Sequence, residues 1–441
     1  MISRPLRRIT SGPAMGNGKR PRGASQRGSG IGSSVSLHEQ RVRRVEEAFR
    51  TLPSRYLGAE DDFDATFQVR LGDVGRTWQV RARGGQCEVR PSATREPDVV
   101  IGSDAATWIA LREGRLSGLD AFAQRRLYAR GDLDLALGFE GLFRLPGDRP
   151  PLLHVTDVKV SGASVRSLIA GEGSEHVICL HGLGSNKASF FRTVSALTPE
   201  YTVHAVDLPG FGGSSKPARA PYDAPYFARA VIGYMDASGL DRAHVVGNSM
   251  GGRIALEVAL AEPDRVQSAS LLSPALAFRK RRTFVPLVRL VRPELAAIPH
   301  QMRAAQVRAQ FWSLFARPDR LDPAAADVAA DEFCRTYRSR SARIAFFAAL
   351  RNIYLDAPHG KRGFWTRLAD LRPPSLFVWG ESDRLVPAAF ARHVAEALPS
   401  SNQVVLPDCG HVPQVELAEQ TNALIRDHLA AAGEISTRLA A

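Results

Sequence analysis

The stretch that most constrains this chain is a serine between two glycines, Gly247-Asn248-Ser249-Met250-Gly251. An apolar run precedes it and a helical pattern follows it, and this setting is typical of a nucleophile elbow. Such a turn is so tight that only small residues fit beside the serine. It holds the Ser249 hydroxyl clear of the sheet and leaves the backbone N–H of Met250 facing a developing oxyanion. Since this short pattern also arises by accident, the rest of the chain must supply a base, an acid and a second oxyanion donor.

From residue 153 onward, short apolar runs alternate with helical segments. Repeated strand–helix units indicate an α/β domain with a mostly parallel, doubly wound sheet. Sites in such sheets lie outside the carboxyl ends of the strands, so residues directly after strands are the candidates. The expected strands are 153–160, 165–170, 177–180, 202–206, 243–246, 269–272, 376–379 and 404–406.

Two side chains that follow late strands complete a candidate catalytic triad with Ser249. His411 follows the last strand and is the expected general base. Asp383 follows the strand before it and would orient the imidazole and stabilise its cation. Glu381, two residues earlier, is the second candidate for that role.

The loop after the short strand 177–180 reads His181-Gly182-Leu183-Gly184. Its glycines let the backbone approach a substrate closely, and the N–H of Leu183 would be the second oxyanion donor beside that of Met250. We interpret His181 as a structural residue that holds this loop.

The order Ser249, Asp383, His411 is that of the α/β-hydrolase family, which this chain resembles over residues 153–431. The turn Asp207-Leu208-Pro209-Gly210-Phe211-Gly212-Gly213-Ser214 resembles the family's D-x-P-G-x-G-x-S turn. We interpret that turn as structural, with its aspartate acting as a cap. The resemblance implies a hydrolase with the three residues as its triad.

The identity of the nucleophile narrows the reaction. A serine, rather than an aspartate, favours acyl-enzyme chemistry on esters, thioesters or lipids. The elbow is also similar to that of the meta-cleavage product hydrolases, which cleave C–C bonds with the same triad. In that family a tryptophan commonly follows the catalytic histidine, whereas Val412 follows His411 here.

Residues 37–145 have a different pattern: a helix over 37–52, several period-2 strands, and three short helical segments. They predict an α+β domain built on an antiparallel meander. The domain resembles the sterol-carrier-protein type of lipid-binding domain over roughly residues 45–145. That family implies a tunnel for an apolar acyl or sterol ligand, which Trp78, Trp108, Phe122 and Phe139 would either line or fill. The residues that carry the resemblance are Pro97-Asp98-Val99-Val100-Ile101-Gly102, Gly114-Arg115-Leu116, Ala121-Phe122 and the ending from Gly131-Asp132-Leu133 to Phe143.

Positive charge is concentrated in two segments of this chain, whose net charge is +13. Residues 1–34 carry seven Lys/Arg and no acid, and residues 275–372 carry 19 Lys/Arg against eight Asp/Glu, which leaves a net charge of −5 elsewhere. Residues 1–36 lack a hydrophobic period and predict a disordered basic tail. An anionic-surface tether, a transit peptide, or a true start at Met15 are alternative interpretations of this tail.

The insertion at 275–372 interrupts the strand–helix pattern and predicts a helical cap, which in the resembled family covers the site and shapes the pocket. Apolar and arginine residues interleave over 278–292. This pattern suits a surface that meets anionic lipid headgroups, or equally a solvated helix surface. No nucleic-acid-binding module is recognisable.

Four cysteines without C-x-x-C spacing favour neither a disulfide framework nor a zinc site, so we predict no metal, no cofactor and a cytoplasmic protein. We therefore expect a serine hydrolase that cleaves an ester or thioester of an apolar, lipid-like acyl substrate, with peripheral contact to an anionic membrane. A C–C bond hydrolase of the meta-cleavage type is one alternative. A non-catalytic lipid carrier with a vestigial hydrolase fold is another, against which the intact triad argues.

Overall fold

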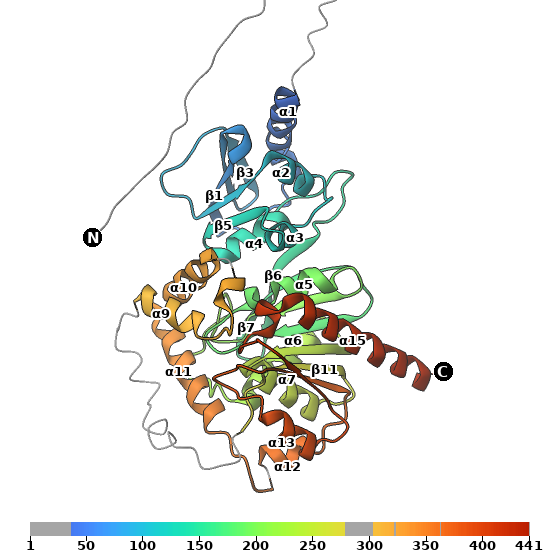
Figure 1. The fold of residues 1–441 in the computed structure, drawn as a ribbon. Coiled ribbons are helices and arrows are strands. Elements are labelled where there is room, and N and C mark those ends of the chain that lie inside the picture. Colours follow the sequence, from blue (N-terminus) through green and yellow to red (C-terminus); the bar gives the residue numbers. More distant parts are fainter. Residues whose placement is uncertain (1–36, 278–302, 322, 362, 441) are drawn as a thin grey trace, which may run out of the picture.

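A computed structural model describes residues 37–277, 303–321, 323–361 and 363–440 (Figure 1). The predicted disordered tail and the arginine-rich start of the cap lie outside these residues. The described chain folds into an N-terminal α+β domain and a larger α/β domain, joined through residues 146–152. None of the helices in the described part is long and apolar enough to cross a membrane.

The first domain is a five-stranded sheet with helices on one face. Its strand order is β3-β2-β1-β4-β5, so the chain passes from edge strand β3 to the far side of β1. The elements are α1 (Leu37–Arg50), β1 (Asp64–Leu71), β2 (Arg76–Arg83), β3 (Gln86–Arg90), β4 (Val99–Ser103), α2 (Ala105–Arg112), α3 (Gly118–Ala123), β5 (Leu127–Gly131) and α4 (Leu133–Gly141).

The expectation of an antiparallel meander was wrong at one pairing, because β4 lies parallel to β1. The connection over residues 91–98 crosses the sheet before β4 begins. Asp98 fixes the new register: its carboxylate accepts the N–H of Thr66 at 2.8 Å, and its own N–H donates to the Thr66 carbonyl at 2.9 Å. Period-2 patterning reports which face of a strand is buried, and it is silent on the direction of the neighbouring strand.

Aromatic side chains fill the core of this domain. Phe49 stacks on Trp78 and on Trp108, with ring centroids 4.1 and 4.8 Å apart, and Trp108 also contacts Phe139. Three of the four aromatic residues expected to line or fill a tunnel therefore belong to the packed core. The fourth, Phe122, is 40% exposed and lies against the second domain.

The second domain is an eight-stranded sheet of order β13-β12-β11-β10-β8-β9-β7-β6. It is parallel from β13 to β9, and only β6 and β7 run antiparallel to their neighbours. The strands are β6 (Leu153–Val160), β7 (Ala163–Ala170), β8 (His176–Leu180), β9 (Thr202–Val206), β10 (Ala243–Asn248), β11 (Val266–Leu272), β12 (Ser375–Gly380) and β13 (Asn402–Leu406).

Helices cover both faces of this sheet, as the alternating pattern predicts. Apolar side chains of α6, α7, α12 and α13 form a core on one face, and those of α5 and α15 form a core on the other. The helices are α5 (Phe191–Leu197), α6 (Ala224–Ala237), α7 (Met250–Ala261), α12 (Phe364–Leu368), α13 (Phe390–Ala397), α14 (Pro413–Glu416) and α15 (Ala418–Ala440).

The insertion between β11 and β12 is helical where the structure describes it. Its helices are α9 (Ala304–Trp312), α10 (Pro323–Tyr337) and α11 (Arg340–Tyr354), followed by α12. They lie beside the sheet, and α10 reaches toward α4 of the first domain (Figure 1).

Candidate active site

Ser249 lies at the turn between β10 and α7. Its backbone angles, φ 54° and ψ −115°, are ones that residues other than glycine rarely adopt. Its N–H donates to the Leu272 carbonyl at 2.9 Å, and its carbonyl accepts the N–H of Ala275 at 2.9 Å. Space beside it is minimal, because a Cβ on Gly251 would lie 1.9 Å from the Leu180 carbonyl oxygen. The structure therefore holds the strained elbow geometry that presents a serine hydroxyl.

His411 and Asp383 come together at the carboxyl ends of the strands. The Nδ1 atom of His411 is 2.8 Å from Oδ2 of Asp383, whose side chain is fully buried. The other carboxylate oxygen accepts the N–H groups of Leu385 and Val386 at 2.8 and 2.9 Å. Because an ionised carboxylate only accepts, Nδ1 carries the proton and Nε2 is left as an acceptor. Glu381 is exposed and does not take this place.

The histidine loop is tied to the elbow through Asn248, the residue before Ser249. The Asn248 side-chain amide donates to the His411 carbonyl at 3.1 Å and to the Leu272 carbonyl at 3.0 Å. The cap contributes too, since the N–H of His411 donates to the Leu314 carbonyl at 2.7 Å. The elbow, the base and the cap are thus joined through backbone and amide contacts that the sequence pattern did not reveal.

The two candidate oxyanion donors flank Ser249. Met250 is the first residue of α7, where N–H groups have no partner within the helix. On the other side, a Cβ on Gly182 would lie 3.4 Å from the Ser249 Cβ, so the loop that carries Leu183 passes directly beside the nucleophile. The structure thus places Met250 and the loop that carries Leu183 next to the serine.

His181 holds the start of that loop. Its Nε2 atom accepts the N–H of Leu208 at 3.0 Å, and Nδ1 lies 2.8 Å from the Gly182 carbonyl, to which it donates. Burial lowers the pKa of this imidazole, which is therefore neutral. Both of its ring nitrogens have hydrogen-bond partners within the fold. This geometry agrees with its interpretation as a structural residue.

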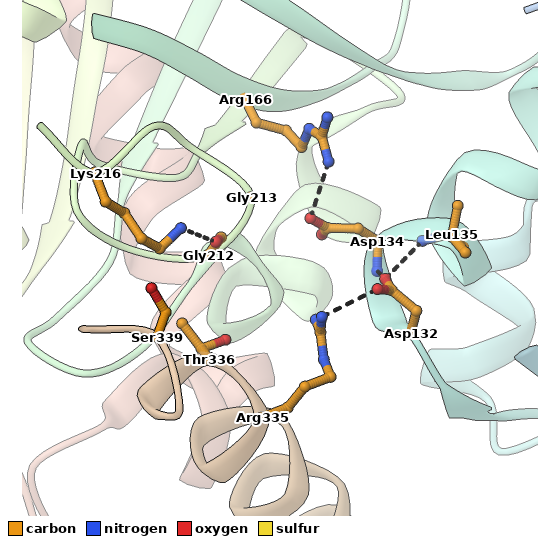
Figure 2. A pocket seen from close by; sticks show the side chains of 10 residues that line it. All are labelled: Asp132, Asp134, Leu135, Arg166, Gly212, Gly213, Lys216, Arg335, Thr336 and Ser339. Atoms are coloured by element: carbon orange, nitrogen blue, oxygen red, sulfur yellow. Dashed lines mark hydrogen bonds and ion pairs between the residues drawn. The ribbon is translucent and has the colours of Figure 1, made fainter. Parts of the chain in front are cut away.

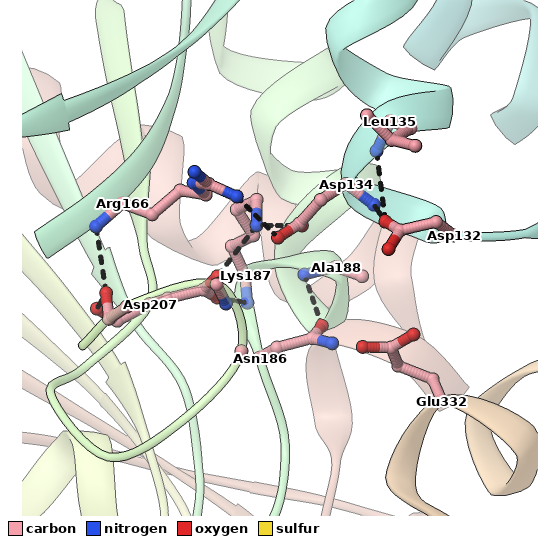
Figure 3. Close-up of polar contacts among 12 residues, drawn as sticks. Asp132, Asp134, Leu135, Arg166, Asn186, Lys187, Ala188, Asp207 and Glu332 are labelled. Atoms are coloured by element: carbon pink, nitrogen blue, oxygen red, sulfur yellow. Dashed lines mark hydrogen bonds and ion pairs between the residues drawn. The ribbon is translucent and has the colours of Figure 1, made fainter. Parts of the chain in front are cut away.

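Sequence reasoning missed the residue that holds the end of the loop. Lys187 is 1% exposed, and its ammonium contacts Asp207 of the turn after β9 and Asp134 of α4 (Figure 3). The only signal in the sequence was a lysine six residues after His181 in an otherwise uncharged loop.

The cap closes over the loop with aromatic side chains. Gly184 adopts φ +72°, and a Cβ there would lie 2.9 Å from the Phe346 ring and 3.2 Å from the Phe333 ring. These rings come from α11 and α10 and place apolar surface next to the candidate oxyanion loop.

A polar cleft of about 410 Å³ lies where α4, the turn after β9 and the cap helix α10 meet (Figure 2). It does not include the three candidate catalytic residues. Lys216 lines the cleft, and its ammonium donates to the carbonyl groups of Gly212 and Ser214, both at 2.8 Å. The other charged lining residues are Asp132, Asp134, Arg166 and Arg335. Within the described residues, no group of His, Cys, Asp and Glu is arranged to hold a metal ion.

Known protein families match both domains of the chain. The alpha/beta hydrolase fold model matches residues 175–417, more than half of the chain. The chain belongs to the α/β-hydrolase family. Its N-terminal domain matches the SCP-2 sterol transfer family over residues 47–144, and we refer to it below as the sterol-transfer domain.

Individual relatives of this hydrolase differ in activity. It is 30% identical over 284 residues to the dihydrolipoyllysine-residue acetyltransferase component of the acetoin cleaving system of Cupriavidus necator, covering 61% of this chain and 67% of that protein. It is also 30% identical to a 2-hydroxy-6-oxononadienedioate/2-hydroxy-6-oxononatrienedioate hydrolase of Pseudomonas putida, covering 59% and 89% of the two chains. The crystal structure of a membrane phospholipase A, a bacterial virulence factor, superposes with a TM-score of 0.55 at 25% identity, covering 74% of this chain and 95% of that one.

Proposed function

We propose that this hydrolase cleaves an ester or thioester of an apolar, lipid-like acyl substrate through an acyl-enzyme. Ser249 is the nucleophile, His411 the general base and Asp383 the group that orients it. The N–H groups of Leu183 and Met250 stabilise the oxyanion. The observation that carries the proposal is the contact between His411 and Asp383 beside the strained elbow.

The chemistry uses each atom in a defined way. Nε2 of His411 takes the hydroxyl proton as the Ser249 oxygen attacks the carbonyl carbon, and the carbonyl oxygen becomes the oxyanion. The imidazolium, stabilised by Asp383, returns the proton to the departing alcohol or thiol. Water then loses a proton to His411 and attacks the acyl-enzyme, which releases the carboxylic acid and frees Ser249.

Three observations support the lipid-like substrate. The structural likeness to the membrane phospholipase A covers 74% of this chain, whereas each of seven other similar structures covers 62–64%. The sterol-transfer domain lies upstream of the hydrolase in the same chain. The rings of Phe333 and Phe346 add apolar surface beside the oxyanion loop.

Hydrolysis of p-nitrophenyl esters of increasing acyl length tests both halves of the proposal. We expect wild type to prefer long acyl chains and Ser249→Ala to be inactive. Activity that survives in Ser249→Ala contradicts the mechanism, and a preference for acetyl over long chains contradicts the lipid-like substrate. A fluorophosphonate probe should label wild type at Ser249, and a protein that resists labelling is a non-catalytic carrier.

A second candidate reaction is C–C bond hydrolysis of a meta-cleavage product. Similarity to the Pseudomonas putida dienedioate hydrolase favours it, and Val412 in place of the commoner tryptophan speaks against it. Loss of the dienoate absorbance of a 2-hydroxy-6-oxohexa-2,4-dienoate compound would detect this activity. A kcat/KM for the dienoate above that for every ester would make it the principal reaction.

We also propose peripheral contact with anionic membranes, on the basis of the excess of 11 positive charges in residues 275–372. Sedimentation with phosphatidylglycerol vesicles, but not with phosphatidylcholine vesicles, is the expected result. Equal sedimentation with both would contradict it.

A further inference from the structure

Each of the two domains contributes a carboxylate to one buried ammonium group. Lys187 begins the short helix that follows the oxyanion loop, and its Nζ atom donates to Oδ2 of Asp207 at 2.7 Å. The same atom donates to Oδ1 of Asp134, which projects from α4 of the sterol-transfer domain (Figure 3). A single cation thus joins a carboxylate from each domain at the end of the loop that carries Leu183.

Both ends of the oxyanion loop are fixed on the same turn. At the start, His181 accepts the N–H of Leu208. At the end, the backbone N–H of Lys187 donates to Oδ1 of Asp207 at 2.7 Å, and Oδ2 of that carboxylate also accepts the N–H of Gly213 at 2.8 Å. The segment from His181 to Lys187 is therefore held at both ends by hydrogen bonds. At its second end, Asp134 contributes through its contact with the Lys187 ammonium.

At Gly213, that turn lies in close contact with the Asp134 side chain of α4. A Cβ on Gly213 would lie 2.3 Å from Oδ2 of Asp134 and 2.4 Å from Cδ of Arg166. A side chain at residue 213 would therefore displace the Asp134 carboxylate or the Arg166 side chain. Arg166 lies 3.5 Å from the same Asp134 oxygen.

The electrostatics keep this contact charged at neutral pH. Burial opposes the charge on Lys187, but Asp207 and Asp134 more than offset it and raise the pKa of the ammonium. Burial also opposes the charge on Asp134, and Lys187 and Arg166 more than offset it and lower the pKa of the carboxyl. A contact of this kind is costly to break, because Lys187 is only 1% exposed and a buried charge without its partner is destabilising.

Apolar contacts also hold α3 and α4 against the second domain. Leu119 is buried within the same apolar core as the sheet of the second domain, and Leu133 and Leu137 pack against that core. The Phe122 ring meets the Phe191 ring edge to face, with centroids 6.2 Å apart. The two helices α3 and α4 therefore form part of the hydrolase core, rather than of a module attached only through the chain.

We propose that Asp134 of the sterol-transfer domain is a positioning residue for hydrolysis. Acting through Lys187, it fixes the loop whose Leu183 N–H faces the oxyanion, so catalysis depends on this contact from the N-terminal domain. This inference rests on the proposed function, because it takes Leu183 as an oxyanion donor.

The test compares Asp134→Asn with Ser195→Ala in the full chain. Ser195 on α5 donates a hydrogen bond to Asp120 of the sterol-transfer domain, so its loss weakens docking without touching the oxyanion loop. The substrate is the p-nitrophenyl ester that wild type prefers. The second readout is the affinity for a trifluoromethyl ketone of the same acyl chain, whose serine adduct carries an oxyanion.

For Asp134→Asn we expect kcat to fall about 10-fold with KM within about 2-fold, because a misplaced donor weakens only the transition state. The ketone should bind more weakly by the same factor as kcat/KM falls. Ser195→Ala should keep kcat and ketone affinity within about 2-fold of wild type. Equal effects of the two substitutions, or a normal ketone affinity in Asp134→Asn, overturn the inference.

Two further results separate the possible failures. If wild type has no turnover that depends on Ser249, the proposed function fails and the inference fails with it. If Asp134→Asn shows no cooperative thermal transition, Asp134→Glu takes its place, since it keeps the charge but displaces the carboxylate by a methylene. A lower kcat with unchanged KM and weaker ketone binding supports the proposal, and wild-type values overturn it.

Discussion

Two buried aspartates follow strands of the same sheet, and their partners give them different tasks. Asp207 follows β9 and holds an ammonium and two backbone N–H groups; Asp383 follows β12 and holds an imidazole and two backbone N–H groups. Both side chains are fully buried. A lysine partner stays charged through any reaction cycle, whereas a histidine partner gains and loses a proton near neutral pH.

Position at a strand's carboxyl end therefore does not by itself make an aspartate catalytic. The Asp207 carboxylate accepts hydrogen bonds from donors that keep their protons, so it holds the turn and the loop in place. The Asp383 carboxylate is bonded to a group whose charge changes as a proton moves. Substitution of each by asparagine should therefore fail in a different way.

The largest expected effect is that of Asp383→Asn on turnover. The amide oxygen would accept the N–H groups of Leu385 and Val386, which leaves the amide NH₂ facing Nδ1 of His411. That donor forces the proton onto Nε2, where the imidazole can no longer act as a base. We expect kcat for the ester to fall about 10⁴-fold, measured by steady-state kinetics.

The control for this prediction is Glu381→Gln. That side chain is exposed and was the second candidate in the sequence, so kcat should stay within about 2-fold of wild type. A larger loss in Glu381→Gln than in Asp383→Asn would reverse the assignment of the two carboxylates.

The next effect, that of Asp207→Asn, should appear in stability. Oδ2 of Asp207 accepts both the Lys187 ammonium and the Gly213 N–H, and an amide NH₂ at that position would confront two donors. If the amide is rotated by 180°, its NH₂ group instead faces the backbone N–H of Lys187, which is also a donor. We expect the free energy of unfolding to fall by about 3 kcal/mol, measured by urea denaturation.

Asp383→Asn is the matched comparison here as well. Its free energy of unfolding should stay within about 1 kcal/mol of wild type, because every buried donor except the imidazole keeps its acceptor. Similar destabilisation of the two variants would remove the distinction between a structural and a catalytic aspartate.

Much of the candidate site was predictable from the sequence because its signals are local. The glycines around Ser249, and residues that directly follow strands, mark the elbow, the candidate base and the candidate acid one at a time. The alternation of strands and helices predicted the doubly wound sheet, and the order of the three residues along the chain then selected one fold family.

What the sequence did not predict depends on contacts between distant segments. Asp134 and Lys187 are 53 residues apart and lie in different domains, and neither has a periodic pattern around it that points to the other. The parallel pairing of β1 with β4 was not predicted for a similar reason, because the direction of β4 is set by the path of residues 91–98. The filled core of the sterol-transfer domain needed the actual packing of Phe49 between two tryptophans.

The smallest expected effect concerns a third buried cluster, which is neutral rather than charged. His204 in β9 lies 2.9 Å from the Tyr234 hydroxyl and 3.1 Å from Nδ1 of His176, and the tyrosine donates to Ser167. Burial, followed by the neighbouring His176 and His154, lowers the pKa of His204 to about 4. Both nitrogen atoms of its ring have partners in the neutral form.

The sign of the pH dependence follows from this lowered pKa. The unfolded chain binds a proton at His204 below about pH 6.5, whereas the folded chain binds it only near pH 4. Stability is therefore full above pH 6.5 and falls as the pH drops toward 4, by about 2 kcal/mol at pH 5 from this group. His204→Gln, which cannot titrate, should lose less stability than wild type between pH 7 and pH 5 in urea denaturation. Equal slopes in His204→Gln and wild type would show that the fold does not lower the pKa of His204.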